Sequence, residues 1–155
     1  AAAQGLPRLA AIQNGYSLLD RQFEIALAEV ALREAVPLIG YSPLAAGLLT
    51  GKYDPENPRK IAGSRSSLSP GFEARFAPRL LGTAARYAAL AREAGLEPAA
   101  MALAFARSRP FMASVLVAAS TPEQLAGNLA AASLDLPREL IKAIDAIHDS
   151  QPNPG

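Results

Sequence analysis

Leu9-Ala-Ala-Ile12 and Pro37-Leu-Ile-Gly-Tyr-Ser42 are two short apolar runs on either side of an amphipathic stretch, and together they decide the fold. Each run is too short for a helix, ends in polar residues and has the composition of a strand buried on both faces. Between them, residues 20–34 place apolar side chains at helical spacing, and Pro37 blocks the continuation of that helix. Strand, helix and strand in this order form one βαβ unit, which predicts parallel strands and an α/β fold.

The same alternation of strand and helix continues to the end of the chain. Two helices are predicted over residues 79–94 and 98–108. A third apolar run, residues 113–119, predicts a third strand. Thr121-Pro-Glu-Gln124 then supplies a threonine N-cap, a proline in the first helical position and a glutamine in the third, so a helix is predicted to begin there. A last amphipathic helix is predicted over residues 137–149.

The segment 43–78 differs from the rest of the chain. It is rich in proline, glycine and serine, with lysine and arginine interspersed. It is too long for an ordinary connection in a compact domain, and loops of this length are usually functional.

Composition excludes several classes of protein. The chain has 155 residues, of which 50% are hydrophobic and 19% charged, so it can bury a core. Fifteen Lys and Arg against 14 Asp and Glu leave a net charge of +1, which is too balanced for a nucleic-acid or membrane-surface binder. Without cysteine, and with His148 as the only histidine, neither a thiol nucleophile nor a metal site is expected. No secretory signal or membrane-spanning run is visible, which favours a cytoplasmic protein.

Residues that could bind a ligand follow the first two runs, at the strand ends where parallel α/β folds bind ligands. Gln13 carries an amide that can pair with a carboxamide such as that of nicotinamide. Tyr41 offers a flat ring for stacking on a heteroaromatic ring, while Ser42 and the backbone from Leu44 to Gly47 could bind pyrophosphate oxygens. Taken singly, a glutamine that caps a turn and a tyrosine packed in the core are the commoner interpretations.

Further polar groups follow the third run and occupy the long loop. Ser120, Gln124 and Asn128 recur every four residues, so they share one face at the start of a helix, where anions are favoured. Lys52 and Arg65 could clamp phosphates. A helix cap with a solvated face and two surface cations are the alternatives. Because three successive strand ends offer groups suited to one dinucleotide, a nucleotide site is the hypothesis that combines them.

Four stretches carry a more specific signal through their order and spacing, namely 12–21 (IQNGYSLLDR), 40–53 (GYSPLAAGLLTGKY), 63–65 (GSR) and 118–128 (AASTPEQLAGN). They resemble the aldo-keto reductase superfamily, especially the branch of the potassium-channel β subunits and related bacterial reductases. The resemblance covers essentially the whole chain. It implies the C-terminal part of a (β/α)8 TIM barrel, with strands six to eight, their helices and a C-terminal helix. Residues 1–155 would then be a single partial domain, with 43–78 as a long cofactor-covering loop.

The resemblance also implies roles for individual residues and a preference for NADPH. Gln13 would hold the nicotinamide carboxamide, and Tyr41 would stack on its ring. The remaining cofactor-binding positions would be Ser42, Leu44, Gly47 and Lys52 along the pyrophosphate, Arg65 over the adenine, and Ser120, Gln124 and Asn128 at the adenosine and its 2′-phosphate.

The chemistry implied by the resemblance is hydride transfer from NADPH to an aldehyde or ketone, with a tyrosine as proton donor assisted by lysine, aspartate and histidine. These four lie in the first half of the family chain, so no catalytic residue is expected here and the isolated chain should be inactive. Its partners would be a small carbonyl substrate and the missing N-terminal half of the barrel. A homo-oligomer is also expected, because strand edges at 9–12 and 115–118 would lack partners. A nucleotide-binding regulatory module and a structural half-barrel are the alternatives.

Overall fold

A parallel sheet of three strands lies at the centre of the molecule. The computed structural model describes residues 4–54, 56 and 77–154, and its strands are β1 (Ile12–Gly15), β2 (Leu38–Tyr41) and β3 (Met112–Val115). β2 lies between β1 and β3 and is parallel to both. Strands that follow one another in sequence are therefore neighbours in space, as they are in a segment of a β/α barrel. The predicted α/β fold with parallel strands is confirmed.

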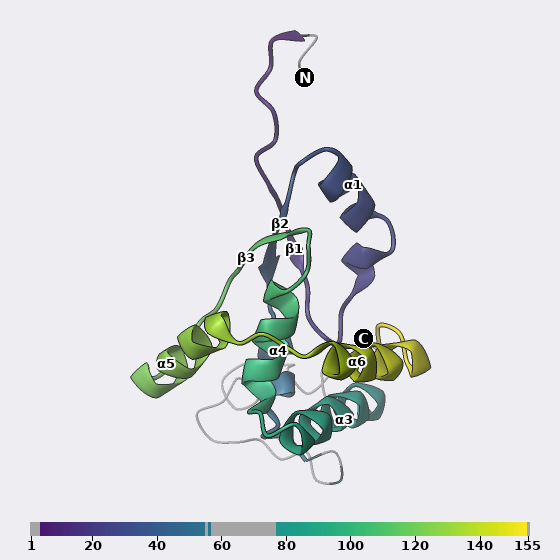
Figure 1. The fold of residues 1–155 in the computed structure, drawn as a ribbon, viewed down its shortest axis with the longest axis vertical. Coiled ribbons are helices and arrows are strands. Elements are labelled where there is room, and N and C mark those ends of the chain that lie inside the picture. The colour runs from purple at the N-terminus through teal and green to yellow at the C-terminus, as the bar shows by residue number, and fades with distance from the viewer. Residues whose placement is uncertain (1–3, 55, 57–76, 155) are drawn as a thin grey trace.

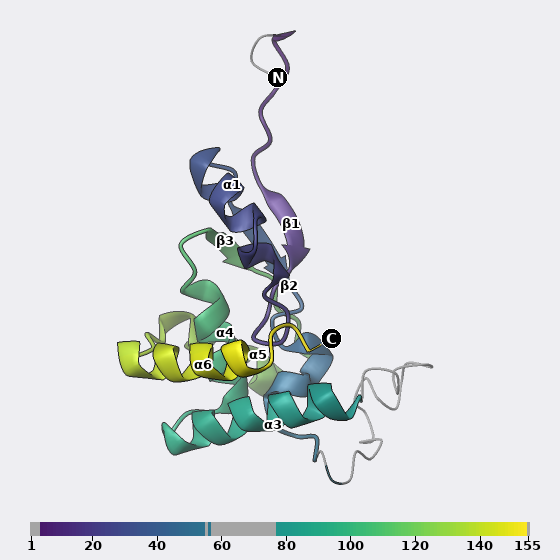
Figure 2. The ribbon, with the colours of Figure 1, turned by 90° about the vertical axis from the view of Figure 1, so that its right-hand side faces the viewer.

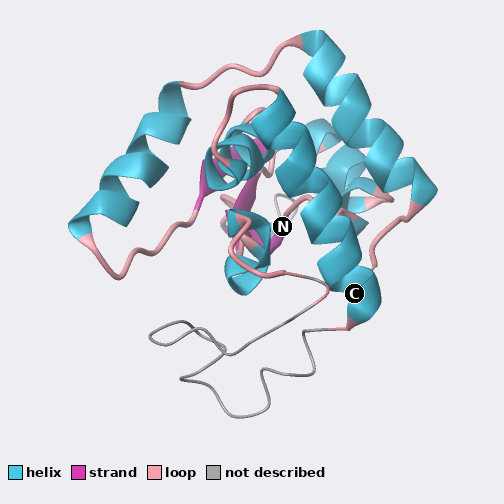
Figure 3. Cartoon of the chain, turned by 90° about the horizontal axis from the view of Figure 1, so that it is seen from below, coloured by secondary structure: helices cyan, strands magenta, loops and turns pink. Residues whose placement is uncertain are grey.

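The helices form a layer on the outside of these strands. They are α1 (Leu27–Arg33), α3 (Pro78–Glu93), α4 (Pro98–Arg107), α5 (Pro122–Ala130) and α6 (Arg138–Ser150), with shorter 3-10 turns η2 (Gln22–Glu24), η3 (Ala45–Thr50) and η5 (Ala131–Ser133). α1, α4 and α6 lie on the same side of the strands (Figure 2). Seen from below, helices lie to the left and to the right of the strands (Figure 3). In the part of the chain that is described, no helix has the length and apolar character needed to cross a membrane.

The first strand begins later than predicted. Residues 9–12 were expected to pair, but Leu9 is 74% exposed and lies in an extended segment that projects from the rest of the chain (Figure 1). Pairing starts at Ile12, whose N–H donates to the carbonyl of Pro37, and it ends at Gly15. An apolar run indicates that a strand is present but does not fix its register, which depends on the partner strand.

The predicted helix over residues 20–34 is wrong in its first half. The chain instead forms η2 and then α1, with a break at Ala26, whose φ is −143°. The break lets Arg21 and Phe23 point into the interior, where both are buried. Burial of these two side chains outweighs the helical spacing of the apolar residues.

The later elements match the predictions more closely. α3, α4 and α6 each agree within one residue at either end with the predicted helices. α5 begins after Thr121, whose hydroxyl accepts a hydrogen bond from the N–H of Gln124 at 3.3 Å, as the capping motif predicted. β3 is shorter than residues 113–119, because after the N–H of Leu116 donates to Gly40 the chain leaves the sheet. Most of the segment 43–78, including Arg65, lies outside the described residues.

The two faces of the sheet differ in what covers them. Side chains alternate along a strand, and on β2 Leu38 and Gly40 are buried while Tyr41 is 46% exposed. Gln13 and Ser114 are in register with Ile39 on either side, and both are exposed. The helix layer therefore covers the Leu38 face, and the face carrying Gln13 and Tyr41 is open among the described residues. In a closed barrel such a face points to the interior.

The core lies between the strands and the helix layer. Its largest fully buried apolar and aromatic side chains are Tyr16, Leu18, Phe23, Leu38, Leu49, Tyr87, Met101, Phe105 and Ile144. The ring of Tyr16 is parallel to that of Phe105 at 6.4 Å between centroids and meets Phe111 edge-on at 5.4 Å. Aromatic contacts therefore connect the loop after β1 to α4 and to the start of β3.

Candidate functional site

A cavity of about 360 Å³ opens at the carboxyl ends of β1 and β2. Its lining residues come from the loop after β1, the end of β2, η3 and α3, and they are Asn14, Gly15, Tyr16, Ser17, Leu19, Asp20, Gln22, Tyr41, Ser42, Ala45, Leu48 and Leu80. Two predicted site residues, Tyr41 and Ser42, are among them. A wall that combines aromatic rings and apolar side chains with several polar groups is typical of a site for a small ring system.

Four polar residues in this lining, Asn14, Ser17, Asp20 and Gln22, were not predicted. Asn14 lies in β1, and the other three follow that strand in a turn where Ser17 and Asp20 exchange backbone hydrogen bonds. The helical spacing of residues 20–34 hid this turn, although the polar character of Gln13-Asn-Gly15 was a signal for it. The described residues that line the cavity include one carboxylate and no lysine or arginine, so the cavity suits an uncharged ring better than a phosphate.

The sequence suggested that Gln13 lies at the end of its strand, but the structure places it inside the strand. It is the second residue of β1 and points to the open face of the sheet, and the cavity lining does not include it. The displacement follows from the later start of β1. Gln13 and Tyr41 nevertheless share the open face, because alternate residues on neighbouring strands point the same way. The role of Gln13 toward a carboxamide stays a prediction.

The segment after β2, residues 44–52, brings together three predicted residues. Leu44 accepts backbone hydrogen bonds from the N–H groups of Gly47 and Leu49 at 2.8 and 3.2 Å. The Nζ of Lys52 lies 3.3 Å from where a Cβ on Gly47 would be. Because the amide of Gly47 is already bonded internally, the ammonium of Lys52 is the more available donor for a phosphate oxygen.

The residues predicted after β3 also lie together. The Oε1 of Gln124 accepts from the N–H of Ser120 at 2.9 Å, and the side-chain amide of Asn128 donates to the carbonyl of Ala118 at 3.4 Å. Gln124 and Ser120 are exposed and Asn128 is half-buried. The helix start at α5 thus presents one polar face, as the four-residue spacing predicted.

A buried charge cluster holds the loop after β1 in place. The guanidinium of Arg21 makes two hydrogen bonds to the carboxylate of Glu24, at 2.8 and 3.0 Å, and one to Asp145 of α6 at 2.8 Å. The hydroxyl of Tyr16 also donates to Glu24. The N–H of Arg21 donates to Asn153 near the end of the chain, at 2.7 Å. The wall of the cavity is therefore tied to α6 and to the residues that follow it.

Two buried tyrosines and the histidine near the cavity have shifted pKa values. Burial, followed by the hydrogen bond to Glu24, raises the pKa of Tyr16 far above its ordinary range. Burial also raises the pKa of Tyr87 to about 12, and its hydroxyl has no hydrogen-bond partner among the described residues. Burial, together with the charge of Arg21, lowers the pKa of His148. Neither buried phenol ionises near neutral pH.

We expect Glu24 to make stability dependent on acid pH. Burial opposes its ionisation, but the hydrogen bonds from Arg21 and Tyr16 outweigh burial and hold the pKa of Glu24 below its ordinary value of 4.5. The ionised group therefore stabilises the fold above pH 4.5, and this contribution is lost as pH falls through the lower folded-state pKa. Urea unfolding measured over a series of acid pH values should show the loss.

Glu24→Gln should flatten this acid dependence, because the amide does not titrate. Glu29→Gln is the matched control, since Glu29 pairs with Arg33 on the exposed surface of α1. An acid dependence that is the same in Glu24→Gln as in the unsubstituted protein would contradict the assignment.

The model of the aldo/keto reductase family matches residues 1–149. The chain belongs to the aldo/keto reductase family. The resemblance found in the four sequence stretches is thereby confirmed.

Individual relatives support the same assignment. Protein tas of Escherichia coli is 46% identical over 143 residues, covering 92% of this chain and 41% of that protein. A putative voltage-gated potassium channel subunit beta from Schizosaccharomyces pombe is 31% identical over 117 residues, covering 72% and 34%. The solved structure of a glycerol dehydrogenase from Gluconobacter oxydans superposes with a TM-score of 0.75 at 25% identity, covering 97% of this chain and 45% of that one. This chain thus spans less than half the length of these relatives.

Proposed function

We propose that this chain is the C-terminal, cofactor-holding part of an NADPH-dependent oxidoreductase that reduces aldehydes or ketones by hydride transfer. The observation that supports the proposal most is the cavity beside Tyr41 and Ser42 at the carboxyl ends of β1 and β2, in a chain of the aldo/keto reductase family. Parallel β/α barrels bind their substrates and cofactors at this end of the strands. A cytoplasmic location belongs to the same proposal.

The described residues fit the parts of a nicotinamide dinucleotide. The exposed ring of Tyr41 and the cavity without cations suit the uncharged reduced nicotinamide. Lys52 supplies a cation for the pyrophosphate on the neighbouring segment 44–52. Ser120, Gln124 and Asn128 form the polar helix start proposed for the adenosine and its 2′-phosphate, and Arg65 is proposed to cover the adenine.

These positions indicate which proposed roles belong to this chain and which to the rest of the barrel. When bound, NADPH supplies the hydride for the carbonyl carbon of the substrate. This chain orients the nicotinamide through Tyr41 and Gln13 and holds the phosphates through Lys52. The proton donor is proposed to come from a preceding half of the barrel, because Tyr16 and Tyr87 are buried and have raised pKa values. The 155 residues alone would then be inactive.

Tyr41→Ala should weaken NADPH binding about tenfold, because it removes the ring proposed to stack on nicotinamide. Tyr41→Phe keeps the ring and should bind as the unsubstituted protein does. The dissociation constants are measured by titration of nicotinamide fluorescence. Equal constants for Tyr41→Ala and Tyr41→Phe would reject this role for Tyr41.

The intact mass of the protein tests the proposal that this chain is part of a longer oxidoreductase. A mass well above 16.1 kDa, together with NADPH binding, is the expected result. A mass of 16.1 kDa without NADPH binding would leave the activity to a longer parent protein.

A nucleotide-binding regulatory module is the second candidate. It is favoured by the match to a putative channel subunit beta, since the name of that protein describes a subunit and not a catalyst. NADPH binding without turnover of any carbonyl compound in the complete protein would favour this candidate over the reductase.

Exposed apolar side chains suggest where the remainder of a barrel would pack. Leu27, Val30 and Leu32 of α1, and Leu125 and Leu129 of α5, are between 41% and 60% exposed. In the described part of the chain, β1 and β3 each pair on one side only. We propose that the N-terminal half covers both sides, and that without it the chain associates with itself as a homo-oligomer.

A further inference from the structure

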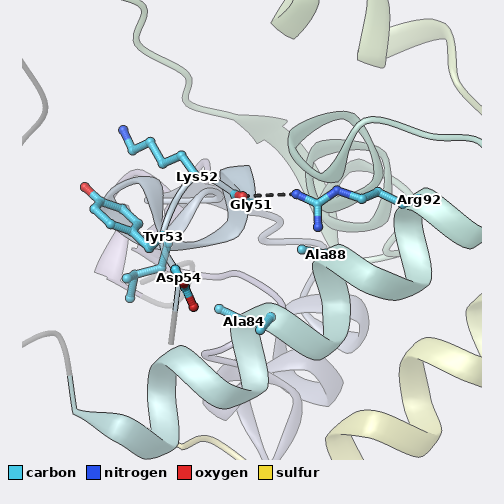
Figure 4. Close-up of a pocket in the computed structure, with 9 residues that line it drawn as sticks. Gly51, Lys52, Tyr53, Asp54, Ala84, Ala88 and Arg92 are labelled. Atoms are coloured by element: carbon cyan, nitrogen blue, oxygen red, sulfur yellow. Dashed lines mark hydrogen bonds between the residues drawn. The ribbon is translucent and has the colours of Figure 1, made fainter. Parts of the chain in front are cut away.

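An arginine on α3 is hydrogen-bonded to the segment 44–52. The Nη2 of Arg92 donates to the carbonyl of Gly51 at 3.0 Å (Figure 4). Gly51 has φ +73°, and a Cβ there would lie 2.8 Å from that same Nη2 and 3.0 Å from the Cγ of Pro98. The left-handed backbone favours glycine at this position, and a Cβ there would displace the guanidinium of Arg92. Gly51 and Arg92 therefore form a fitted contact between the segment and the helix layer.

The hydrogen bond between Arg92 and Gly51 lies next to Lys52, the residue proposed to bind the phosphates. Lys52 follows Gly51 in the chain, and its Nζ lies against Gly47 and 5.2 Å from the ring centroid of Tyr53. On the N-terminal side of Gly51, the hydroxyl of Thr50 donates to the carbonyl of Gly47 at 2.8 Å. With Gly51 held, the backbone that carries Lys52 has few ways to move.

Arg92 and Lys52 point in different directions from this backbone. In Figure 4 the guanidinium of Arg92 reaches the carbonyl of Gly51 from α3, while the side chain of Lys52 extends away from that helix. Both line one cavity of about 290 Å³, which also includes Asp54. Because the Nη2 of Arg92 is already bonded to the carbonyl of Gly51, Arg92 is placed to bind the protein backbone, and Lys52 remains the cation proposed for the phosphate.

We propose that Arg92 is a positioning residue for cofactor binding, acting through Gly51 to hold Lys52 where it meets the pyrophosphate. The inference rests on the proposed function, since it takes NADPH as the ligand of Lys52. It predicts that the loss of one hydrogen bond, remote from the ligand, weakens binding without loosening the core, because the side chain of Arg92 is exposed.

The test compares variants of the complete protein by titration with NADPH. Arg92→Gln should raise the dissociation constant about five- to tenfold, the equivalent of one hydrogen bond. Arg92→Lys keeps a donor and should recover part of the affinity. Gly51→Ala should also weaken binding, because its Cβ displaces the guanidinium and strains the backbone. Arg86→Gln is the matched control, since Arg86 is an exposed arginine of the same helix that donates to Ser150 instead.

Two readouts separate positioning from other roles. Positioning predicts the same midpoint of urea unfolding for Arg92→Gln and Arg86→Gln, and little further loss of affinity when Arg92→Gln is added to Lys52→Ala. A full additional loss in the Lys52→Ala background would mean that Arg92 acts on the ligand independently of Lys52, which would overturn the inference. Unchanged affinity in Arg92→Gln, or equal losses in Arg92→Gln and Arg86→Gln, would overturn it as well. If the unsubstituted protein does not bind NADPH at all, the proposed function fails, and this inference fails with it.

Discussion

Arg21→Ala should lower the free energy of unfolding by about 3 kcal/mol, the lower end of the range for removal of one partner of a buried ion pair, because Asp145 is 40% exposed. The side chain of Arg21 is 7% exposed and is paired with both Glu24 and Asp145. Its removal leaves the half-buried carboxylate of Glu24 with only the hydroxyl of Tyr16 as a partner. Urea unfolding at neutral pH measures the loss.

Arg33→Ala is the control for this result. Arg33 also makes an ion pair, with Glu29 at 2.7 Å, but the two side chains are 77% and 67% exposed. Exposed pairs of this kind contribute at most about 0.5 kcal/mol. A loss for Arg21→Ala no larger than that for Arg33→Ala would show that the buried cluster does not stabilise the fold.

Phe105→Ala is the second substitution with a large expected effect, about 3–5 kcal/mol of unfolding free energy. Phe105 is fully buried in α4, and two guanidinium groups approach its ring, those of Arg21 at 5.0 Å and Arg109 at 4.3 Å from the ring centroid. The alanine would leave a cavity and would also remove the aromatic face from both cations.

Phe105→Leu separates these two contributions, because it keeps most of the apolar volume and removes the ring. Its loss of stability should be smaller than that of Phe105→Ala. A double-mutant cycle between Phe105→Leu and Arg21→Ala should give a coupling of about 0.5–2 kcal/mol. Additive losses in the cycle would show that the guanidinium and the ring do not interact.

The elements that the sequence predicted well are those whose signals are local. The start of α5 depends on Thr121 and Gln124, which are three residues apart and cap the helix by themselves. The register of β1 and the break before α1 depend on distant partners. Leu9 has the composition of a strand residue, yet Ile12 is where pairing with β2 begins.

The candidate site shows the same difference between residues placed by local signals and residues placed by distant partners. Tyr41 and Ser42 lie at the end of a strand that was correctly placed, so their position in the cavity could be predicted. Asp20 and Gln22 reach the cavity through a turn that exists because Arg21 is buried. The partner of Arg21 on α6, Asp145, lies 124 residues further along the chain, and no periodicity connects residues at such a separation.

The bonds from Arg21 to Asp145 and Asn153 also bear on how the protein is made. Ribosomes release the chain from its N-terminus, so Arg21 emerges long before the two groups that complete its pairing, which are 124 and 132 residues behind it. Until then neither the bond from the guanidinium to Asp145 nor the bond from the backbone N–H to Asn153 can form. The unit can therefore reach its final stability only after translation has passed Asn153, and a product that stops short of that residue would be left open to proteases.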